Sequence, residues 1–376
     1  MSKTDVKNTM QIHSQAKVEF YAAYLSRYLQ ILCKSQYITQ INIFDVFCGT
    51  GVYEDGKKGS PVVAFDDIIK VACNNTRISL IINDIEIDKI NRVRAYIEAQ
   101  NNKACNVEYF NLDVEEMFAK VYNRVSQTST NTRNLIFIDP YGYKNIRNDI
   151  LHKLMENGKT EVILFLPISH MHRFTQAAMK DEYTVQYAPL RKFINSFFAV
   201  SHKMRTEKLP VMDYIQNISK ALKYNDKFFT TSYYIERDKT NYFALFFMTS
   251  HKYGFEKILE VKWELDDKAG RGFTQPESPG LFDEILDEQS RNESFKCLEN
   301  ILLNYLTNPK TNQQIYNFTL ENEFLPKHTN AIFERWQSEK DNFKVYVINS
   351  GLEARKKSFY LTQREDVVKF VLEAKS

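Results

Sequence analysis

Residues Ile41–Gly51 read I-N-I-F-D-V-F-C-G-T-G. The apolar residues first alternate and then run together, as in a strand that is buried on both faces of a parallel sheet. The strand ends at Gly49-Thr50-Gly51, where two glycines permit a tight turn and a close backbone approach to a ligand, because neither carries a Cβ. An ordinary glycine turn is the alternative. We favour a ligand pocket, because Asp45 and Phe47 precede the glycines in a combination that is uncommon by chance.

The pattern D-x-F-x-G-T-G resembles the first motif of class I S-adenosylmethionine-dependent methyltransferases. This resemblance implies a Rossmann-like α/β fold with a methyl-donor pocket after the first strand. The residues that it implies at the pocket are Asp45, Phe47, Gly49, Thr50 and Gly51.

Composition leaves several classes of protein open. The chain has 376 residues, enough for two domains, and 43% of them are hydrophobic, so a sizeable core is expected. A formal net charge of +3 neither demands nor excludes a nucleic-acid partner. No apolar run approaches the roughly 18 residues of a membrane helix, and the N-terminus lacks a signal-peptide core, which predicts a cytoplasmic protein.

The five cysteines are scattered and form no C-x-x-C pair. Metal and iron–sulfur sites need converging ligands, so we predict neither, and we expect reduced, mostly buried thiols.

Helical spacing of apolar residues predicts a helix over Ala16–Leu32 that packs on the sheet. Lys17 and Tyr21 at its start could face the ligand, but a place on the helix surface is the preferred interpretation. A polar loop follows Gly51, and its lysines, Lys57 and Lys58, are candidate substrate contacts or simply exposed. Ser60 fits an N-cap with Pro61 at the first helical position.

Acidic residues follow the next two predicted strands. Asp84, 33 positions past Gly51, comes after the strand Ile78–Ile82 and could hold both ribose hydroxyls of a nucleoside. Helix capping is its alternative role, since a helix is expected to begin near Glu86. Asp113 follows the strand Val107–Phe110 and could contact the adenine amino group, although a surface turn would look the same.

The strand Leu135–Ile138 ends in Asp139-Pro140-Tyr141-Gly142-Tyr143-Lys144. This segment resembles the D/N-P-P-Y/F motif of amino-directed methyltransferases, in which the acid and a carbonyl accept hydrogen bonds from an amine and the ring stacks on a base. A duplex target would have to be flipped out. The second proline is absent here, which leaves the acceptor atom open. A plain strand-end turn explains the proline and glycine but not the pairing of Asp139 with an aromatic residue.

A helix over Ile146–Met155 and a strand over Val162–Leu166 are expected next. His172 and Arg173 then could bind phosphate or act as a base, but a solvated loop is the preferred interpretation. Helices over 176–227 would cap the pocket, and a hairpin follows at Ser232–Ile235 and Tyr242–Met248. The predicted fold is a seven-stranded α/β sheet, mostly parallel, with one antiparallel strand.

A break rich in glycine and proline from Gly270 to Gly280, followed by the acidic stretch Asp283–Glu288, predicts a linker. Beyond it, helices at Phe295–Tyr305, from Thr311 and at Lys327–Trp336, with strands at Lys344–Ile348 and Ser358–Leu361, resemble a winged helix, which binds nucleic acid or protein. The predicted domains are a methyltransferase-like domain over 1–268 with a cap over about 168–228, a linker over 269–290, and a winged helix over 291–376.

The order D-V-F-C-G-T-G, K-K-G-S-P, N-D, F-I-D-P-Y-G-Y-K and E-V-I-L-F-L-P, ending in a winged helix, resembles the three-Cys-motif partner family, TcmP. The resemblance implies a methyltransferase-like fold and an associated protein that carries the three cysteines.

The leading hypothesis is a methyltransferase that acts on nucleic acid with S-adenosylmethionine as cofactor and no metal. Its acceptor site would comprise Asp139, Pro140 and Tyr141, and further substrate contacts would come from Lys57, Lys58, Tyr143, Lys144, His172 and Arg173. Two alternatives remain: a non-catalytic nucleic-acid-binding or scaffolding protein on a retained fold, and a nicotinamide-dependent enzyme, since the glycine turn is shared.

Overall fold

The computed structural model describes residues 9–71, 73, 75–101, 103–181, 183–274 and 283–373, with side chains between 283 and 287 left out. The chain divides into two compact units. The first unit extends to Val261 and also includes the short stretch that begins at Arg271. The second unit comprises Lys262–Gly270 and the chain from Pro276.

Within the described residues, the first unit contains an eight-stranded sheet in the order β3-β2-β1-β4-β5-β7-β6-β8. β7 runs antiparallel to both of its neighbours, β5 and β6, and the other pairs are parallel. The strands are β1 Gln40–Asp45, β2 Arg77–Asn83, β3 Asn106–Phe110, β4 Thr132–Ile138, β5 Thr160–Leu166, β6 Phe229–Asp238, β7 Asn241–Thr249 and β8 Gly272–Phe273. The mostly parallel sheet and its antiparallel strand confirm the α/β prediction, with β8 added at the edge.

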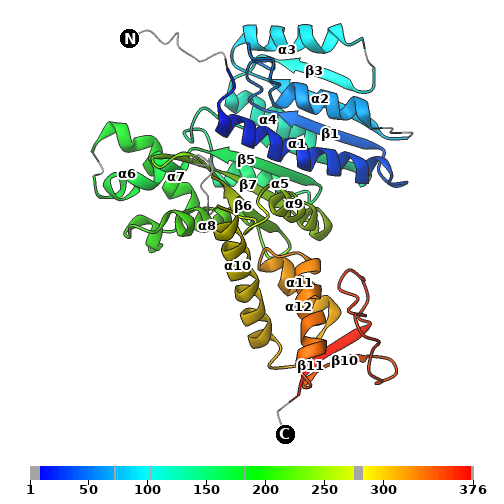
Figure 1. Cartoon of the computed structure of the whole chain (residues 1–376). Coiled ribbons are helices and arrows are strands. Elements are labelled where there is room, and N and C mark those ends of the chain that lie inside the picture. The colour runs from blue at the N-terminus through cyan, green and yellow to red at the C-terminus, as the bar shows by residue number, and fades with distance from the viewer. Residues whose placement is uncertain are drawn as a thin grey trace. The chain divides into compact units, whose positions relative to one another are not determined.

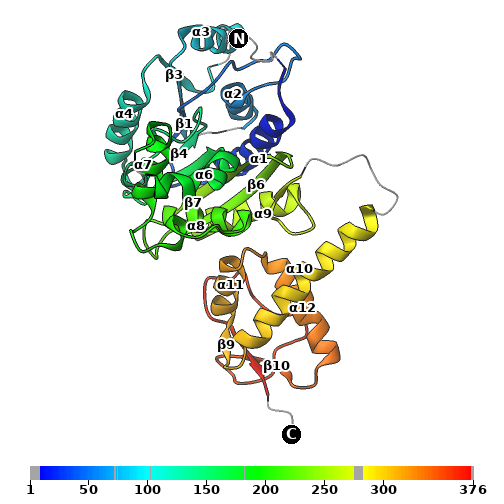
Figure 2. The same ribbon diagram turned by 90° about the vertical axis from the view of Figure 1, so that its left-hand side faces the viewer.

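Helices cover both faces of this sheet. Figure 2 shows α1 and α2 on one side of β1 and β4, and α4 and α7 on the other. The apolar residues of α4 to α8 pack with one face of the strands into a single buried cluster. The helices of the first unit are α1 Ile12–Cys33, α2 Ser60–Lys70, α3 Ile87–Ala99, α4 Val114–Ser126, α5 Asn148–Met155, α6 Ile168–Lys180, α7 Ala188–Phe197, α8 Val211–Leu222 and α9 Lys252–Leu265, which continues into the second (Figure 1).

The strand order places a switch point at the centre of the sheet. β2 and β3 lie to one side of β1, whereas β4 and β5 lie to the other. Asp45 at the end of β1 is in register with Ile82 of β2 and Phe137 of β4, so the carboxyl ends of these strands lie level. Ligands of open α/β sheets bind in the crevice outside such a switch point.

Several local predictions need correction. Gly59, not Ser60, is the N-cap of α2, and Ser60 is its first residue. The helix α9 was not anticipated. Cys33 and Cys73 form a disulfide, and of the remaining cysteines Cys48 is buried while Cys105 and Cys297 are not, so the expectation of reduced, mostly buried thiols is wrong.

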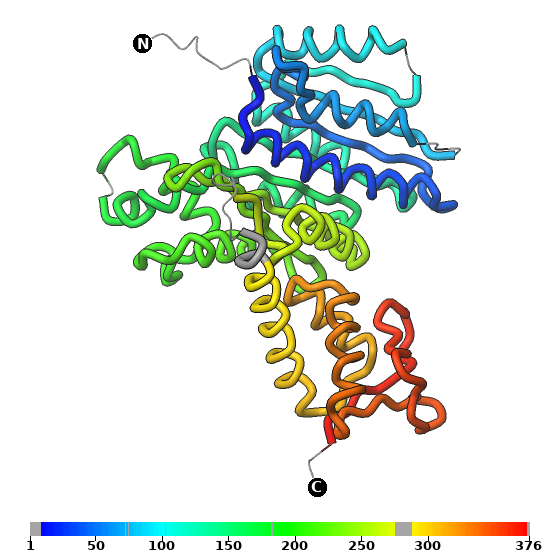
Figure 3. The backbone as a smooth tube through the Cα atoms, in the orientation of Figure 1, coloured from blue at the N-terminus to red at the C-terminus, as the bar shows by residue number. Residues whose placement is uncertain are grey.

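The second unit combines the helices α10, α11 and α12 with a small antiparallel sheet in the order β10-β11-β9. Figure 3 traces the course of the backbone. Trp336 and Phe333 pack on Phe343 and Phe370 from the strands. The elements are α10 Asp283–Tyr305, β9 Lys310–Thr311, α11 Asn312–Glu321, α12 Pro326–Glu339, β10 Phe343–Val347 and β11 Val368–Leu372.

Two predictions for this unit are wrong. The acidic stretch Asp283–Glu288 begins α10 rather than a linker, and Ser358–Leu361 is not a strand, because β10 pairs with Val368–Leu372. Most of the break between Gly270 and Gly280 lies outside the described residues. The winged-helix assignment remains a prediction.

Candidate functional site

The turn after β1 adopts the conformation that its glycines permit. Gly49 and Gly51 have φ values of +65° and +74°, which L side chains rarely adopt. A Cβ at Gly51 would also come within 2.6 Å of the side chain of Val93, and the Gly51 carbonyl accepts a hydrogen bond from the N–H of Gly59 at 2.6 Å. The loop that separates this turn from α2 therefore folds back onto it. The hydroxyl of Thr50 is buried without a hydrogen-bond partner among the described residues.

Asp84, the residue after β2, holds this turn in place. Its Oδ2 accepts a hydrogen bond from the N–H of Gly49 at 3.0 Å, and its Oδ1 accepts one from the N–H of Glu86 at 2.9 Å. Lys89 completes the cluster, with Nζ 3.8 Å from Asp84 and 2.6 Å from Glu86. Asp84 is 1% exposed, and in this conformation its carboxylate accepts hydrogen bonds from the protein's own backbone.

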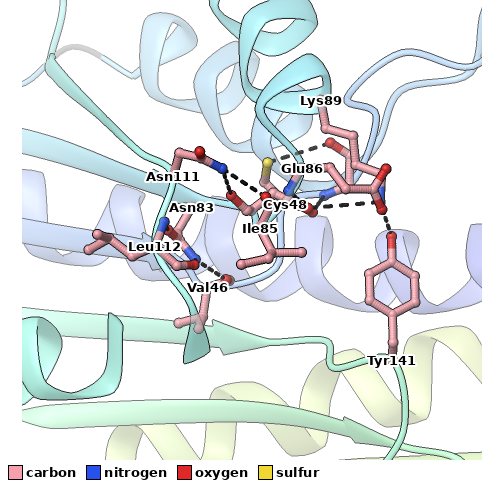
Figure 4. A network of polar contacts seen from close by, with 11 residues as sticks. Val46, Cys48, Asn83, Ile85, Glu86, Lys89, Asn111, Leu112 and Tyr141 are labelled. Atoms are coloured by element: carbon pink, nitrogen blue, oxygen red, sulfur yellow. Dashed lines mark hydrogen bonds and ion pairs between the residues drawn. The ribbon is translucent and has the colours of Figure 1, made fainter. Parts of the chain in front are cut away.

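Two asparagines join the ends of the first three strands (Figure 4). The amide of Asn83 donates to the carbonyls of Val46 and Leu112, and its oxygen accepts from the N–H of Leu112 at 3.0 Å. The amide of Asn111 donates to the carbonyls of Asp84 and Ile85, each at 2.9 Å. These bonds hold together the loops that follow β1, β2 and β3, where a nucleoside was predicted to bind.

Asp45 is a buried carboxylate without a partner. It is 0% exposed, and neither oxygen has a hydrogen-bond partner among the described residues. Burial raises the pKa of Asp45 to about 7, and Asp139 and Asp84 add to the rise, while the Ser60 hydroxyl and the Lys17 ammonium oppose it. Buried polar groups are normally paired, so an exception at a strand end beside a glycine turn marks a candidate ligand site.

Asp139 lies at the end of β4 and forms an ion pair with Lys17 of α1. The side chain of Lys17 is only 11% exposed, and Nζ also lies 4.8 Å from the centre of the Phe165 ring. Tyr21, one turn further along α1, is fully buried and stacks on Phe137 at 4.4 Å. The preferred expectation, that Lys17 and Tyr21 are surface residues of the helix, is therefore wrong.

The segment after Asp139 presents an aromatic ring to solvent. Tyr141 is 76% exposed, and its hydroxyl bonds to Lys89, whose Nζ lies 4.6 Å from the ring centre. Gly142, with φ of +117°, closes the turn. Lys89 thus connects the ends of β2 and β4. Tyr143 instead turns toward α6 and α7, where its hydroxyl lies 2.9 Å from Nδ1 of His170.

Asp113 is the N-cap of α4. Its Oδ1 accepts hydrogen bonds from the N–H groups of Glu115 and Glu116, both at 2.9 Å, and Glu116 completes a capping box. The carboxylate is exposed. Its predicted contact with adenine remains a prediction, because the capping role accounts for its position.

The two loop lysines have protein partners. Nζ of Lys57 donates to the side chain of Gln15 at 2.9 Å, and Nζ of Lys58 lies 2.5 Å from the carboxylate of Asp66. Both remain exposed.

The residues His172 and Arg173 belong to α6, so the expectation of a solvated loop is wrong. His172 bonds through Nδ1 to the hydroxyl of Tyr242 at 2.8 Å and through Nε2 to the carbonyl of Leu209 at 2.7 Å. Both ring nitrogens therefore form hydrogen bonds to residues outside α6 and hold this helix in place. Arg173 donates to the carbonyl of Thr240.

Lys144 borders a cationic groove. A cavity of about 310 Å³ is lined by Lys144 and Arg147 of the loop after β4, by Lys153 of α5 and by Lys192 of α7. Among the described residues that line it, Glu115 is the only acid. Within the described residues, none of the three lysines forms an ion pair, whereas Arg147 pairs with Asp149. The rings of Phe118 and Tyr122 also line the groove.

Within the parts of the chain that the structure covers, no group of three or more His, Cys, Asp or Glu side chains is placed to hold a metal ion. The described helices likewise include none that is both long and apolar enough to span a membrane.

Comparisons with known proteins give remote likenesses. No family model and no curated protein matches the chain, so membership in TcmP is not supported. Among solved structures, the bifunctional kinase–methyltransferase WbdD has a TM-score of 0.35 at 13% identity over 62% of this chain and 39% of WbdD. An O-methyltransferase from Bacillus cereus in complex with SAH scores 0.31 at 10% identity over 60% of this chain and 80% of that one. TrmN from Thermus thermophilus scores 0.27 at 12% identity over 61% and 52%.

TM-scores from 0.27 to 0.35 are too low to carry a conclusion about the fold or the activity of this chain. This chain covers well under half the length of WbdD, and likenesses this remote carry no conclusion about its substrate.

Proposed function

We propose that this chain is an S-adenosylmethionine-dependent methyltransferase that acts on nucleic acid. The observation that carries the proposal is Asp45: a buried, unpartnered carboxylate at the switch point of the sheet, beside a glycine turn. S-adenosylmethionine supplies an electrophilic methyl group on a positively charged sulfur. A cationic ligand would relieve the cost of keeping Asp45 charged and buried.

Each neighbouring residue has a distinct part in this proposal. Asp84 sets the backbone of the donor turn through the N–H of Gly49. Each of its oxygens can accept a further hydrogen bond, which a ribose hydroxyl would donate. Ile85, 60% exposed directly after Asp84, offers an apolar surface to an adenine ring.

Asp139 would orient the acceptor. Lys17 engages Oδ2 of Asp139, so Oδ1 is the atom that would accept a hydrogen bond from an acceptor amine. The exposed ring of Tyr141 would stack on the base. Positioning the nucleophile in line with the methyl group would then provide most of the rate enhancement.

The cationic groove supports nucleic acid as the class of acceptor. The loop that carries Asp139 and Tyr141 continues to Lys144 on the wall of that groove. Unpaired lysines beside aromatic rings suit a phosphodiester chain, whose bases can stack while its phosphates are neutralised.

The donor part of the proposal is tested by calorimetry with S-adenosylmethionine and by transfer of a labelled methyl group to nucleic acid. We expect Asp139→Ala to abolish transfer and to leave donor binding unchanged, because Asp139 faces the acceptor. If the wild-type chain binds no donor, either alone or with a partner protein, the proposed enzymatic activity is wrong. The alternative, a non-catalytic nucleic-acid-binding or scaffolding protein, would then remain.

A second variant separates catalysis from structure. Asp139→Ala also leaves the Lys17 ammonium without its partner. The double variant Lys17→Met with Asp139→Ala removes both charges. If transfer returns in the double variant, Asp139 serves only to hold Lys17, and its acceptor role is wrong.

Replacing Lys144, Lys153 and Lys192 together by glutamine should weaken binding of a labelled single-stranded oligonucleotide. The slope of log affinity against log salt should decrease by about 2, since each lost phosphate contact removes roughly 0.7 from it. Fluorescence anisotropy over a range of NaCl concentrations measures both quantities. The matched control replaces the exposed residues Lys34, Lys70 and Lys103 and changes the charge equally. Equal effects of the two triple variants would contradict a specific groove.

The same proposal retains three expectations from sequence. They are a three-Cys-motif partner protein, a winged helix in the second unit, and a cytoplasmic location. The Cys33–Cys73 disulfide makes the location testable, because disulfides are rare in reducing compartments.

A further inference from the structure

A second cavity lies at the opposite end of the sheet from the candidate methyl-donor site. Its volume is about 440 Å³. Arg133 and Glu161, the second residues of β4 and β5, lie on its wall, with tyrosines from α1 and the start of α9. Asp139 follows Arg133 by six residues along β4, so about 20 Å of strand separates the two sites.

Two polar groups on this wall have unused hydrogen-bonding capacity. The hydroxyl of Tyr28 and Nε2 of His251 are buried and have no partner among the described residues. Burial raises the pKa of Tyr28 and lowers the pKa of His251, so both side chains are neutral at pH 7. Two unpaired groups on one cavity wall point to a ligand with polar edges.

Glu161 provides an acceptor deep in the cavity. It is 3% exposed and accepts hydrogen bonds from the hydroxyls of Tyr24 at 2.5 Å and Thr249 at 2.7 Å. Each oxygen can accept one more. A Cβ at Gly254 would lie 2.5 Å from Oε1 of Glu161, so the absence of a side chain there gives the carboxylate its space.

The mouth of the cavity is aromatic and positively charged. Tyr37 and Tyr253 line it and are 80% and 53% exposed. Arg133 donates to the backbone carbonyls of Thr130 and Thr132 and forms no ion pair with an acid among the described residues. Lys257, in contrast, is paired with Glu260 at 2.6 Å. Arg133 is therefore the cation left for an anionic group.

We propose that this cavity binds a mononucleotide, with the base between the tyrosines, its N–H edge on Glu161 and its phosphate near Arg133. A nucleobase combines a planar ring with ring or exocyclic N–H donors, and the phosphate supplies the anion. The volume lies in the range of about 300–1,000 Å³ that is usual for small-molecule sites. This site does not depend on the methyl-donor site.

The test is calorimetry of the full chain with AMP, GMP, CMP and UMP, one at a time. We expect at least one of them to bind, and Arg133→Gln to weaken its affinity at least tenfold, while Lys103→Gln, which removes the same charge from an exposed position, does not. Tyr37→Ala, a substitution at an exposed position, should weaken binding several-fold and keeps the test valid if Arg133→Gln fails to fold.

The outcomes are distinguishable from those at the methyl-donor site. If no nucleotide binds at millimolar concentration, or if neither variant weakens binding, the proposal is wrong. If S-adenosylhomocysteine displaces the bound nucleotide, the nucleotide occupies the methyl-donor site, and the proposal is likewise wrong.

Discussion

Replacing Asp84 by alanine should lower the free energy of unfolding of the first unit by about 3–5 kcal/mol, as when one partner of a buried charge network is lost. The substitution leaves the N–H groups of Gly49 and Glu86 without their acceptor, and it removes one of the two carboxylates beside the ammonium of Lys89. Because Asp84 also sets the turn at the proposed donor site, S-adenosylmethionine binding should be lost. Urea unfolding followed by circular dichroism measures the first effect, and calorimetry measures the second.

Two controls restrict what this result can mean. Asp113→Ala also removes a carboxylate after a neighbouring strand, but this carboxylate is an exposed N-cap, so the expected loss is only about 1 kcal/mol. Both tryptophans, Trp263 and Trp336, belong to the second unit. Their fluorescence should therefore stay native in Asp84→Ala. If Asp84→Ala costs no more than Asp113→Ala, the turn does not depend on Asp84.

The positions of these acids could be predicted, but their partners could not. Asp45, Asp84 and Asp139 each follow an apolar strand, and parallel strands bring their carboxyl ends to one edge of the sheet. The ion pair of Asp139 with Lys17 spans 122 residues, and the bond of Lys89 to Tyr141 spans 52. No local spacing indicates such pairs. The Glu86–Lys89 pair, at i and i+3, was accessible from sequence and was missed.

Other errors have a local physical cause. His172 and Arg173 are polar residues after a strand, so the pattern favoured a loop, but α6 buries Met171 and Thr175 on the side that packs on the core. The last strand was misplaced because Ser358–Leu361 and Val368–Leu372 both contain short apolar runs. Pairing with Phe343–Val347, which is not local, decides between them.

Asp45→Asn should change how stability depends on pH. The folded-state pKa of Asp45 is about 7 against an ordinary value of 3.8, so between these values the folded chain binds a proton that the unfolded chain has released. Stability therefore decreases as pH rises through this window. Asparagine remains neutral at every pH and should make the chain more stable than wild type by up to about 4 kcal/mol at pH 8, with little difference near pH 4.

The matched control is Glu161→Gln, because burial also raises the pKa of Glu161 to about 7. Both variants should flatten the pH profile of urea unfolding, but only Asp45→Asn should lose S-adenosylmethionine binding. Glu161 accepts hydrogen bonds from two hydroxyls, which offset part of its burial. Neither oxygen of Asp45 lies in hydrogen-bonding geometry among the described residues, and only the Ser60 hydroxyl and the Lys17 ammonium nearby oppose the cost of its charge. A carboxylate that destabilises the folded chain, and whose oxygens form no hydrogen bond among the described residues, is explained by a ligand that pairs with it. If Asp45→Asn bound the donor normally, this explanation would fail.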